Sequence, residues 1–300
     1  MKIVVTGSLG HISRPLTEDL VNKGHRVTVI SRKSERRTEI EAMGATAAIG
    51  TMHDAEFLAT TFAQADAVYV MEATSPESFA DSNIDITAVM DQIVGNYKQA
   101  ILKAGVKRVV HLSSIGAHTN QGNGILKFHY QAEKILDTLP SDVSLSFIRP
   151  VGFYGNLLGF IPTIKAQGVI ASNYAGDEKK PWVSPLDIAT VVAEELTGDS
   201  HDRRVRYVAS EEISCNEIAA ILGAAIGQPH LSWILISDEQ LLQGMVAFGM
   251  NPTIAAGFVE MNAAIRSGLL YEDYGRHRPV LGKIKVRDFA SEFAAAYNQV

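Results

Sequence analysis

The sequence predicts an α/β protein with a Rossmann-type, doubly wound parallel sheet and a smaller helical C-terminal lobe. Two observations lead to this fold class. Short runs rich in Val and Ile alternate with helical patterns over the first 150 residues, as in parallel βαβ units. A turn that contains two glycines follows the first of these runs and opens a helix, which is how doubly wound folds begin.

The strands and helices of the first half follow from their patterns. The apolar runs predict strands at 2–5, 26–30, 67–71, 108–112 and 144–148, with a weaker one at 45–49. These runs are apolar on both faces, as expected of a sheet that helices cover on both sides. Apolar residues at spacings of three and four predict a helix from Ile86 to Gly105, and Asp54 can cap a helix that runs through Phe62.

The pattern changes after Pro150. Pro, Gly and aromatic residues become denser over 151–182, a strand-like run follows at 204–209, and 214–274 has a helical pattern. We therefore expect a Rossmann domain at 1–155 and a smaller lobe at 156–300, with segments near 181–210 returning to the Rossmann sheet.

Composition limits the classes of function. The 300 residues are 46% hydrophobic, and the net charge of −6 argues against a nucleic-acid surface. No run is apolar enough to span a membrane, and the start lacks a secretory signal. The single cysteine, Cys215, excludes an internal disulfide, and the scattered histidines do not favour a metal site. We expect a cytoplasmic protein that binds no nucleic acid, membrane or metal, with the acidic pairs at 194–195 and 211–212 in solvent.

The turn at residues 6–13 is a candidate phosphate cradle. Gly7 permits the tight turn and Gly10 lets the backbone approach a pyrophosphate, while the first N–H groups of the helix face the anion. We therefore expect Leu9, His11 and Ile12 to lie at a bound dinucleotide as well. Ser13 stands where a third glycine usually permits close packing of helix and strand.

The end of the second strand indicates which dinucleotide binds. Enzymes that use NAD tend to have Asp or Glu there, to hold the ribose 2′-hydroxyl. This chain has Ser31 and Arg32 instead, with further basic residues close behind. Arg32 can hold a 2′-phosphate or stack on adenine. We therefore expect NADP(H) in preference to NAD(H), the alternative being a solvated basic loop.

With these residues in view, the chain resembles the NmrA-like branch of the atypical short-chain dehydrogenases/reductases. Within that branch it is most similar to the group of triphenylmethane reductase and NADPH:quinone oxidoreductase. The resemblance covers nearly the whole length. It rests on the glycine turn, the basic end of the second strand, and the segments at 106–114, 129–136, 147–150 and 182–189.

The resemblance implies a cofactor that lies over the ends of the strands. The adenine side would meet Arg32 and the turn that holds Thr51 and Met52. The other contacts that it implies are Met71, Glu72 and Ala73 at the ribose and pyrophosphate, Ser113 near the nicotinamide, and Pro150, Val151 and Phe153 near the ring.

Two registers compete for the catalytic helix. Tyr130 and Lys134 have the YxxxK spacing of typical short-chain dehydrogenases, in which the tyrosine donates a proton. In the quinone-reductase-like group the helix reads HxxxE, which selects His129 and Glu133. We favour His129, which would bind the nicotinamide ribose or donate to the substrate oxygen with an unperturbed pKa. Tyr130 stays the alternative, and Arg149 reads as architectural.

The leading hypothesis is an NADPH-dependent reductase that transfers hydride to an electron-poor conjugated acceptor, such as a quinone or a dye-like molecule. The lobe at 156–300, rich in Met and Phe, would form the apolar lid over a small apolar or aromatic acceptor. A second hypothesis is a non-catalytic NADP(H) sensor that acts through a protein partner, and a third is an enzyme like the sugar-nucleotide epimerases. Whether the chain forms a homodimer is left open.

Overall fold

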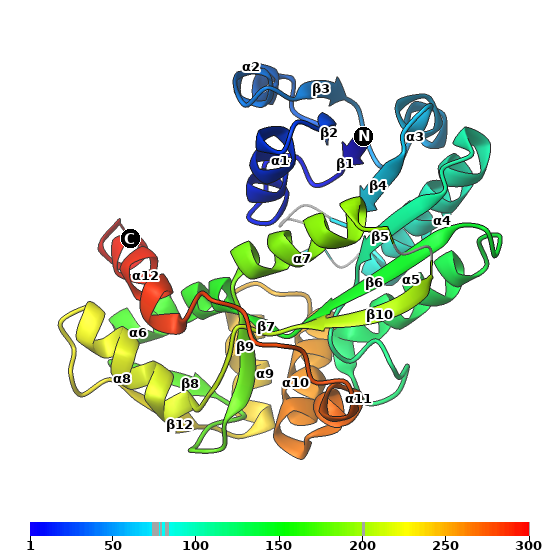
Figure 1. The fold of residues 1–300 in the computed structure, drawn as a ribbon. Coiled ribbons are helices and arrows are strands. Elements are labelled where there is room, and N and C mark those ends of the chain that lie inside the picture. Colours follow the sequence, from blue (N-terminus) through cyan, green and yellow to red (C-terminus); the bar gives the residue numbers. More distant parts are fainter. Residues whose placement is uncertain (74–77, 79, 82–83, 200–201, 300) are drawn as a thin grey trace.

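The computed structural model describes residues 1–73, 78, 80–81, 84–199 and 202–299. Seven parallel strands form its main sheet, in the order β10-β6-β5-β4-β1-β2-β3 (Figure 1). They are β1 (Lys2–Val5), β2 (Arg26–Ser31), β3 (Thr46–Ile49), β4 (Ala67–Val70), β5 (Arg108–Leu112), β6 (Ser144–Pro150) and β10 (Arg203–Val208). The order reverses beside β1, where doubly wound folds have their ligand crevice. The predicted fold class is confirmed, and each predicted strand matches an observed one, with β6 extending further than expected, to Pro150.

Helices cover both faces of this sheet, because its central strands are apolar on both sides. On one face pack α1 (Ser13–Asn22), α2 (Arg37–Ala42) and α7 (Pro185–Thr197). On the other pack α3 (Ala55–Phe62), α4 (Ile86–Ala104) and α5 (Lys127–Asp137). Asp54 caps α3 as predicted, since its Oδ1 accepts hydrogen bonds from the Glu56 and Phe57 N–H groups at 3.0 Å.

The rest of the chain builds a smaller lobe with its own apolar core. Its helices are α6 (Ile161–Gln167), α8 (Cys215–Ala225), α9 (Asp238–Ala247), α10 (Pro252–Ser267), α11 (Glu272–Arg276) and α12 (Val286–Gln299). Its short strands are β7 (Gly152–Phe153), β8 (Val169–Ser172), β9 (Lys180–Val183), β11 (Glu211–Ile213) and β12 (Ser232–Leu235). The prediction of an entirely helical stretch at 214–274 is therefore wrong at β12, which pairs with β8.

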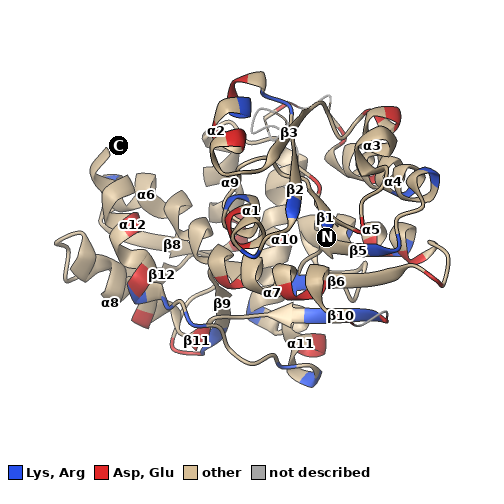
Figure 2. Cartoon of the chain, turned by 45° about the horizontal axis from the view of Figure 1, so that its top comes forward, with Lys and Arg blue, Asp and Glu red and all other residues tan. Residues whose placement is uncertain are grey.

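The expectation that both acidic pairs lie in solvent is wrong in part. Glu211 and Glu212 are half-buried, and Glu211 accepts a hydrogen bond from the Tyr154 hydroxyl at 2.7 Å. The side chain of Glu195 is 1% exposed, whereas the sequence placed it in solvent. Its carboxylate accepts hydrogen bonds from Ser146 at 2.6 Å and from Arg204 and Arg206 of β10, both at 2.8 Å. Figure 2 shows the run of basic residues along β10, coloured blue on the cartoon.

No helix in the described ranges is both long and apolar enough to span a membrane.

Candidate functional site

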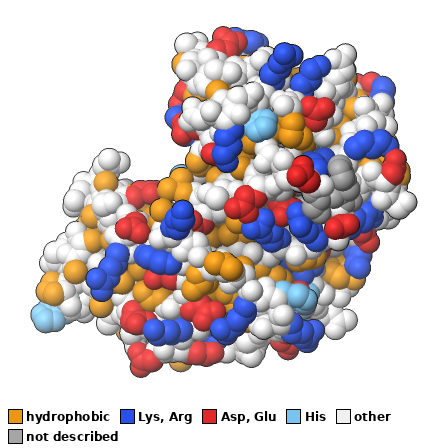
Figure 3. Space-filling model, viewed as in Figure 1, with side chains coloured by type: hydrophobic (Ala, Val, Ile, Leu, Met, Phe, Trp, Pro, Cys, Tyr) orange, Lys and Arg blue, Asp and Glu red, His pale blue; other side chains and the backbone are white. Residues whose placement is uncertain are grey.

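The predicted site residues come together because the sheet is parallel. The loops after β1, β2, β3, β4, β5 and β6 all leave the same edge of the sheet, and this edge faces the small lobe (Figure 1). Hydrogen bonds tie neighbouring loops together: the Ser8 N–H donates to the Ile30 carbonyl at 3.1 Å, and the Met71 N–H donates to Thr6 Oγ1 at 3.0 Å. Figure 3 shows hydrophobic side chains along the hollow between the part that holds β1–β3 and the small lobe.

The glycine turn is built closely around Gly7. This residue has a φ of +84°, and a Cβ on it would lie 2.6 Å from Ser13 Oγ and 3.0 Å from Met71 Sδ. Ser13 Oγ donates a hydrogen bond to the Thr6 carbonyl at 2.8 Å, across the junction of β1 and α1. Serine can therefore take the place of a third glycine, because it is small and its hydroxyl binds the strand that it packs against.

Three backbone donors of this turn have no partner among the described residues. Gly10 and Arg14 donate their N–H groups to the carbonyls of Gly7 and Gly10. In contrast, no described residue accepts a hydrogen bond from the N–H of Leu9, His11 or Ile12. Unpartnered N–H groups at the start of a helix are the groups that bind a pyrophosphate. The turn therefore fits the phosphates of a dinucleotide.

Arg32 lies exposed directly after β2. Its neighbours are paired: Arg36 donates to Glu39 at 2.6 Å and Arg37 to Glu41 at 3.4 Å. For Arg32 there is no such carboxylate among the residues that the structure describes. A free guanidinium at this strand end is suited to an anionic group of the ligand.

The turn after β3 is fixed against β2. The Gly50 N–H donates to the Ser31 carbonyl at 3.0 Å, which brings Thr51 beside the end of β2. Met52 is buried, and its carbonyl accepts a hydrogen bond from Asn96 at 3.1 Å. The turn that holds the two predicted adenine contacts is thus tied to the end of β2, directly before Arg32.

Glu72, one of the three contacts implied after β4, has its side chain buried against His111 of β5. Its carboxylate accepts hydrogen bonds from His111 Nε2 at 2.9 and 3.1 Å, and the two side chains are 1% and 0% exposed. Burial disfavours the charged form of both groups. Their mutual attraction and hydrogen bonds outweigh burial, so the pKa of Glu72 is lowered and that of His111 is raised. The backbone of Met71–Ala73 stays at the edge of the site, with Met71 held by Tyr97, whose hydroxyl donates to its carbonyl at 2.8 Å.

His129 lies beside this buried pair, close enough for its charge to interact with Glu72 and His111. Its side chain is half-buried, and no described residue binds its buried Nδ1. Burial lowers the pKa of His129 to about 3, against the weaker opposite effect of Glu72. The expectation of an unperturbed pKa is therefore wrong: the ring is neutral at neutral pH.

Tyr130 is also half-buried, on the same helix. Its ring contacts the Lys134 ammonium, which lies 5.2 Å from the ring centroid, and Lys134 itself is exposed. The tyrosine and lysine of the YxxxK spacing thus contact each other along the helix. It is His129 that interacts with groups from β5 and the loop after β4.

Ser113, after β5, is buried, and its hydroxyl donates to Glu133 Oε1 at 2.5 Å. Pro150 ends β6 and accepts a hydrogen bond from the Ile115 N–H at 2.9 Å. Val151 is buried, and Phe153 in β7 is half-buried. These four residues lie together at the ends of β5 and β6, and their contact with a nicotinamide stays a prediction.

The sequence analysis did not select His111. This residue is inside a strand, where a histidine gives no signal beyond its neighbours, and only the fold shows that it meets Glu72. Arg149 is architectural as interpreted, but its partner was not predicted: it binds Glu133 through two nitrogens at 2.9 and 2.6 Å. A pairing across 16 residues between a helix and a strand has no periodic signature in the sequence. In the described ranges no three His, Cys, Asp or Glu side chains gather as metal ligands would.

The model of the NmrA-like family matches residues 1–268. The chain belongs to the NmrA-like family. This confirms the resemblance that the glycine turn and the strand-end residues indicated.

Two curated relatives match this NmrA-like protein over nearly their whole length. The NAD(P)H azoreductase of Xenophilus azovorans is 27% identical over 296 residues, which cover 98% of this chain and 97% of the relative. The (4-alkanoyl-5-oxo-2,5-dihydrofuran-3-yl)methyl phosphate reductase of Streptomyces griseus is 26% identical over 300 residues, covering 98% and 99%. Both names agree with the prediction of an oxidoreductase.

Solved structures agree in fold. An NADPH-dependent quinone oxidoreductase of Escherichia coli, complexed with NADPH, has a TM-score of 0.80 at 19% identity and covers 97% of this chain and 99% of its own. The triphenylmethane reductase of Citrobacter sp. has a TM-score of 0.75 at 19% identity, covering 98% and 100%.

Proposed function

We propose that this NmrA-like protein is an NADPH-dependent reductase that passes hydride to an electron-poor conjugated acceptor, such as a quinone or a dye-like molecule. One observation carries the proposal. At the carboxyl edge of the sheet, backbone N–H groups without partners in the described part of the chain lie between Arg32, likewise unpaired there, and the unpartnered Nδ1 of His129.

Each group of site residues would bind a different part of the cofactor. Arg32 would bind the 2′-phosphate, with Thr51 and Met52 at the adenine. The N–H groups of the glycine turn would bind the pyrophosphate. When bound, the reduced nicotinamide supplies the hydride. Ser113 and the apolar residues at 150–153 would hold this end of the cofactor in a dry environment.

Because His129 is neutral, the favoured acceptor is one that needs no proton from this residue. A neutral imidazole can donate one N–H hydrogen bond to a ribose hydroxyl or to a substrate oxygen, but it carries no surplus proton at neutral pH. Ser113 has its hydroxyl proton committed to Glu133. An acceptor that delocalises the incoming electron pair needs no acid from the protein, and its proton can come from water.

The small lobe offers the apolar surface that such an acceptor needs. None of the ten residues of α9 is fully buried, and Phe248 just after it is 83% exposed. The turn between α9 and α10 reaches the loop beyond β4, where Asn251 donates to the Asp81 carbonyl at 3.4 Å. The exposed and half-buried apolar side chains of this region, among them Phe248 and Met245, are available to an acceptor. The activities named for the azoreductase and the dye reductase support the same class of acceptor.

The test is oxidation of NADPH, followed by the absorbance of the reduced nicotinamide, with a panel of quinones, azo dyes and triarylmethane dyes. NADH runs in parallel. Arg32→Ala should raise the KM for NADPH roughly 30-fold, because a charge-assisted hydrogen bond contributes about 2 kcal/mol, and should leave the KM for NADH nearly unchanged.

Arg37→Ala is the matched control, because Arg37 is a neighbouring exposed arginine already paired with Glu41. An equal loss in both variants would contradict the 2′-phosphate role of Arg32. Binding of NADPH without turnover of any acceptor would contradict the reductase and favour the NADP(H) sensor instead.

A further inference from the structure

A buried cluster of charges lies next to the candidate site. Arg149, at the end of β6, is 6% exposed, and Glu133 of α5 is 8% exposed. The Nε of Arg149 donates to Glu133 Oε1 at 2.9 Å, and one terminal nitrogen donates to Oε2 at 2.6 Å. Two parallel hydrogen bonds of this kind fix the direction of both side chains as well as their separation.

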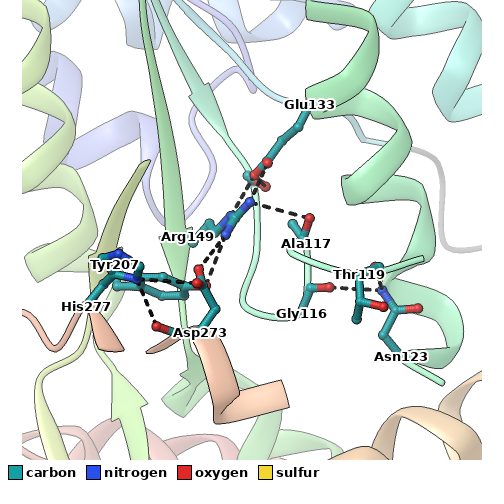
Figure 4. Close-up of polar contacts among 10 residues, drawn as sticks. Gly116, Ala117, Thr119, Asn123, Glu133, Arg149, Tyr207, Asp273 and His277 are labelled. Atoms are coloured by element: carbon teal, nitrogen blue, oxygen red, sulfur yellow. Dashed lines mark hydrogen bonds and ion pairs between the residues drawn. The ribbon is translucent and has the colours of Figure 1, made fainter. Parts of the chain in front are cut away.

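The same guanidinium also binds the small lobe. Its other terminal nitrogen donates to Asp273 of α11 at 3.0 Å and to the Tyr207 hydroxyl of β10 at 3.1 Å. Tyr207 in turn donates to Asp273 at 2.8 Å. Figure 4 shows Arg149 between Glu133 on one side and Asp273 with Tyr207 on the other. Arg149 therefore joins a helix of the Rossmann half, a strand of its sheet and a helix of the lobe.

Glu133 and His129 are neighbours on α5. They are four residues apart, so their side chains leave the same face of the helix, one turn from each other. The two hydrogen bonds from Arg149, called the fork below, fix Glu133 and therefore also fix the rotation of α5 about its axis. The direction in which the His129 ring points depends on that rotation.

The cluster is internally satisfied, which argues against a role in binding an anionic ligand. Arg149 faces two carboxylates, Ser113 donates to one of them and Tyr207 to the other. Burial opposes the charge of Arg149, but its bonds to Glu133 outweigh this and raise its pKa. The guanidinium has no direction left free toward the cofactor, so it acts through the residues it holds.

From this we infer that Arg149 is a positioning residue for His129: its fork on Glu133, anchored to the lobe through Asp273, sets the orientation of the His129 ring. The inference rests on the proposed function only for its effect on turnover. The orientation of the ring itself can be measured without any acceptor.

The test compares Arg149→Lys with Arg206→Lys. Lysine keeps the positive charge but cannot form the fork. Arg206 is the matched control, because it pairs with Glu194 at 2.6 Å and Glu195 at 2.8 Å, and both of these partners lie on α7 instead of α5. The measurements are the NMR resonances of the His129 ring, assigned with His129→Asn, the Kd for NADPH, and kcat with the best acceptor.

Arg149→Lys should shift the ring resonances and lower kcat by about tenfold or more, since small misplacements of reacting groups are costly. Its Kd for NADPH should change by less than about threefold, because the glycine turn and Arg32 carry most of the binding. Arg206→Lys should leave all three as in the unmodified protein. If Arg149→Lys does not fold, Glu133→Gln, which keeps the shape of the side chain, should shift the same resonances.

Unchanged ring resonances in a folded Arg149→Lys variant would overturn the inference, as would an equal shift in Arg206→Lys. A protein that binds no NADPH would instead contradict the proposed function. The resonances of the ligand-free variants would then still decide the positioning role.

Discussion

At the scale of single residues, burial decides what a group can do more than its identity does. His129 was selected by sequence as a histidine able to transfer protons near neutral pH. In the fold its Nδ1 is buried without a described partner, and its pKa falls to about 3. The same side chain thereby becomes a neutral hydrogen-bonding group, which agrees with an acceptor that needs no proton from the protein.

This pKa predicts how stability depends on pH. In the unfolded chain the imidazole binds a proton below its ordinary pKa of 6.5, whereas in the fold it stays neutral down to a pKa of about 3. The unfolded state therefore holds more protons in this window, so the stability contributed by His129 is lost as pH falls from about 6.5 toward 3. One proton corresponds to at most about 1.4 kcal/mol per pH unit.

His129→Asn should therefore flatten the decline of the free energy of unfolding between about pH 6.5 and about pH 5. The check is denaturant unfolding of both proteins at several pH values in this range. Glu72 and His111 remain in both proteins, so their own titration largely cancels in the difference. Parallel curves would show that His129 ionises with an ordinary pKa in the fold.

Some single residues could be assigned from sequence and others could not. Arg32 and Ser13 belong to a local turn, so their surroundings follow from nearby residues. Glu195 and Glu133 are each buried by arginines of the strand that follows their helix, 9 to 16 residues further along the chain, and no periodic pattern reveals this. The fold determines the partners of a buried charge, so the pairings of Glu195 and of Glu133 with arginines could not be predicted from sequence.

At the scale of elements, the positions of long or clearly periodic strands and helices could be predicted from sequence, and those of very short strands could not. Most strands of the main sheet carry apolar runs, and the helix α4 has a clear apolar stripe, so their positions followed from sequence. The strand β7 has two residues and pairs with β9, which contains Pro181. Strands this short have no alternation to detect, and they form because a partner is already in place.

The junction between η3 (Gly124–Leu126) and α10 yields a prediction for the start of α5. Gly124 has a φ of +58°, and a Cβ on it would lie 2.1 Å from the Gly257 carbonyl and 2.5 Å from the Met261 nitrogen, both backbone atoms. Gly124→Ala should therefore lower the free energy of unfolding by about 2 kcal/mol or more.

The matched control is Gly95→Ala, within α4. A Cβ at this helical position meets nothing within 4 Å. Because glycine costs about 1 kcal/mol relative to alanine inside a helix, this variant should be more stable than the unmodified chain. Thermal unfolding of both variants checks the opposite signs, and a neutral Gly124→Ala would mean that η3 and α10 do not pack this closely.

At the scale of the whole molecule, the two halves interlock. The chain leaves the Rossmann sheet after β6, returns through α7 and β10, and then builds most of the small lobe (Figure 1). The residues before α12 return once more to α7. The division at residue 155 stays a prediction, but a cut there would remove β10 and the helix that covers β5 and β6.

Asp187 of α7 binds the segment before α12 where it packs back against the Rossmann half. Its carboxylate accepts hydrogen bonds from the Ser210 hydroxyl at 2.6 Å and from the N–H groups of Lys283 and Ile284, both at 3.1 Å. Asp187→Asn would turn an amide NH₂ toward one of these donors, at a cost of about 2–3 kcal/mol. Glu194→Gln, at an exposed position of the same helix, should change stability by less than about 0.5 kcal/mol.

The two tryptophans, Trp182 and Trp233, both contribute to the core of the small lobe, so their fluorescence reports that lobe while far-UV circular dichroism reports the whole chain. In an interlocked molecule, weakening the contact at Asp187 weakens both halves together. The two signals should therefore move to a lower denaturant midpoint in Asp187→Asn and still coincide. A fluorescence transition that separates from the dichroism transition would show that the lobe unfolds on its own, and that the returning segments do not make the halves one cooperative unit.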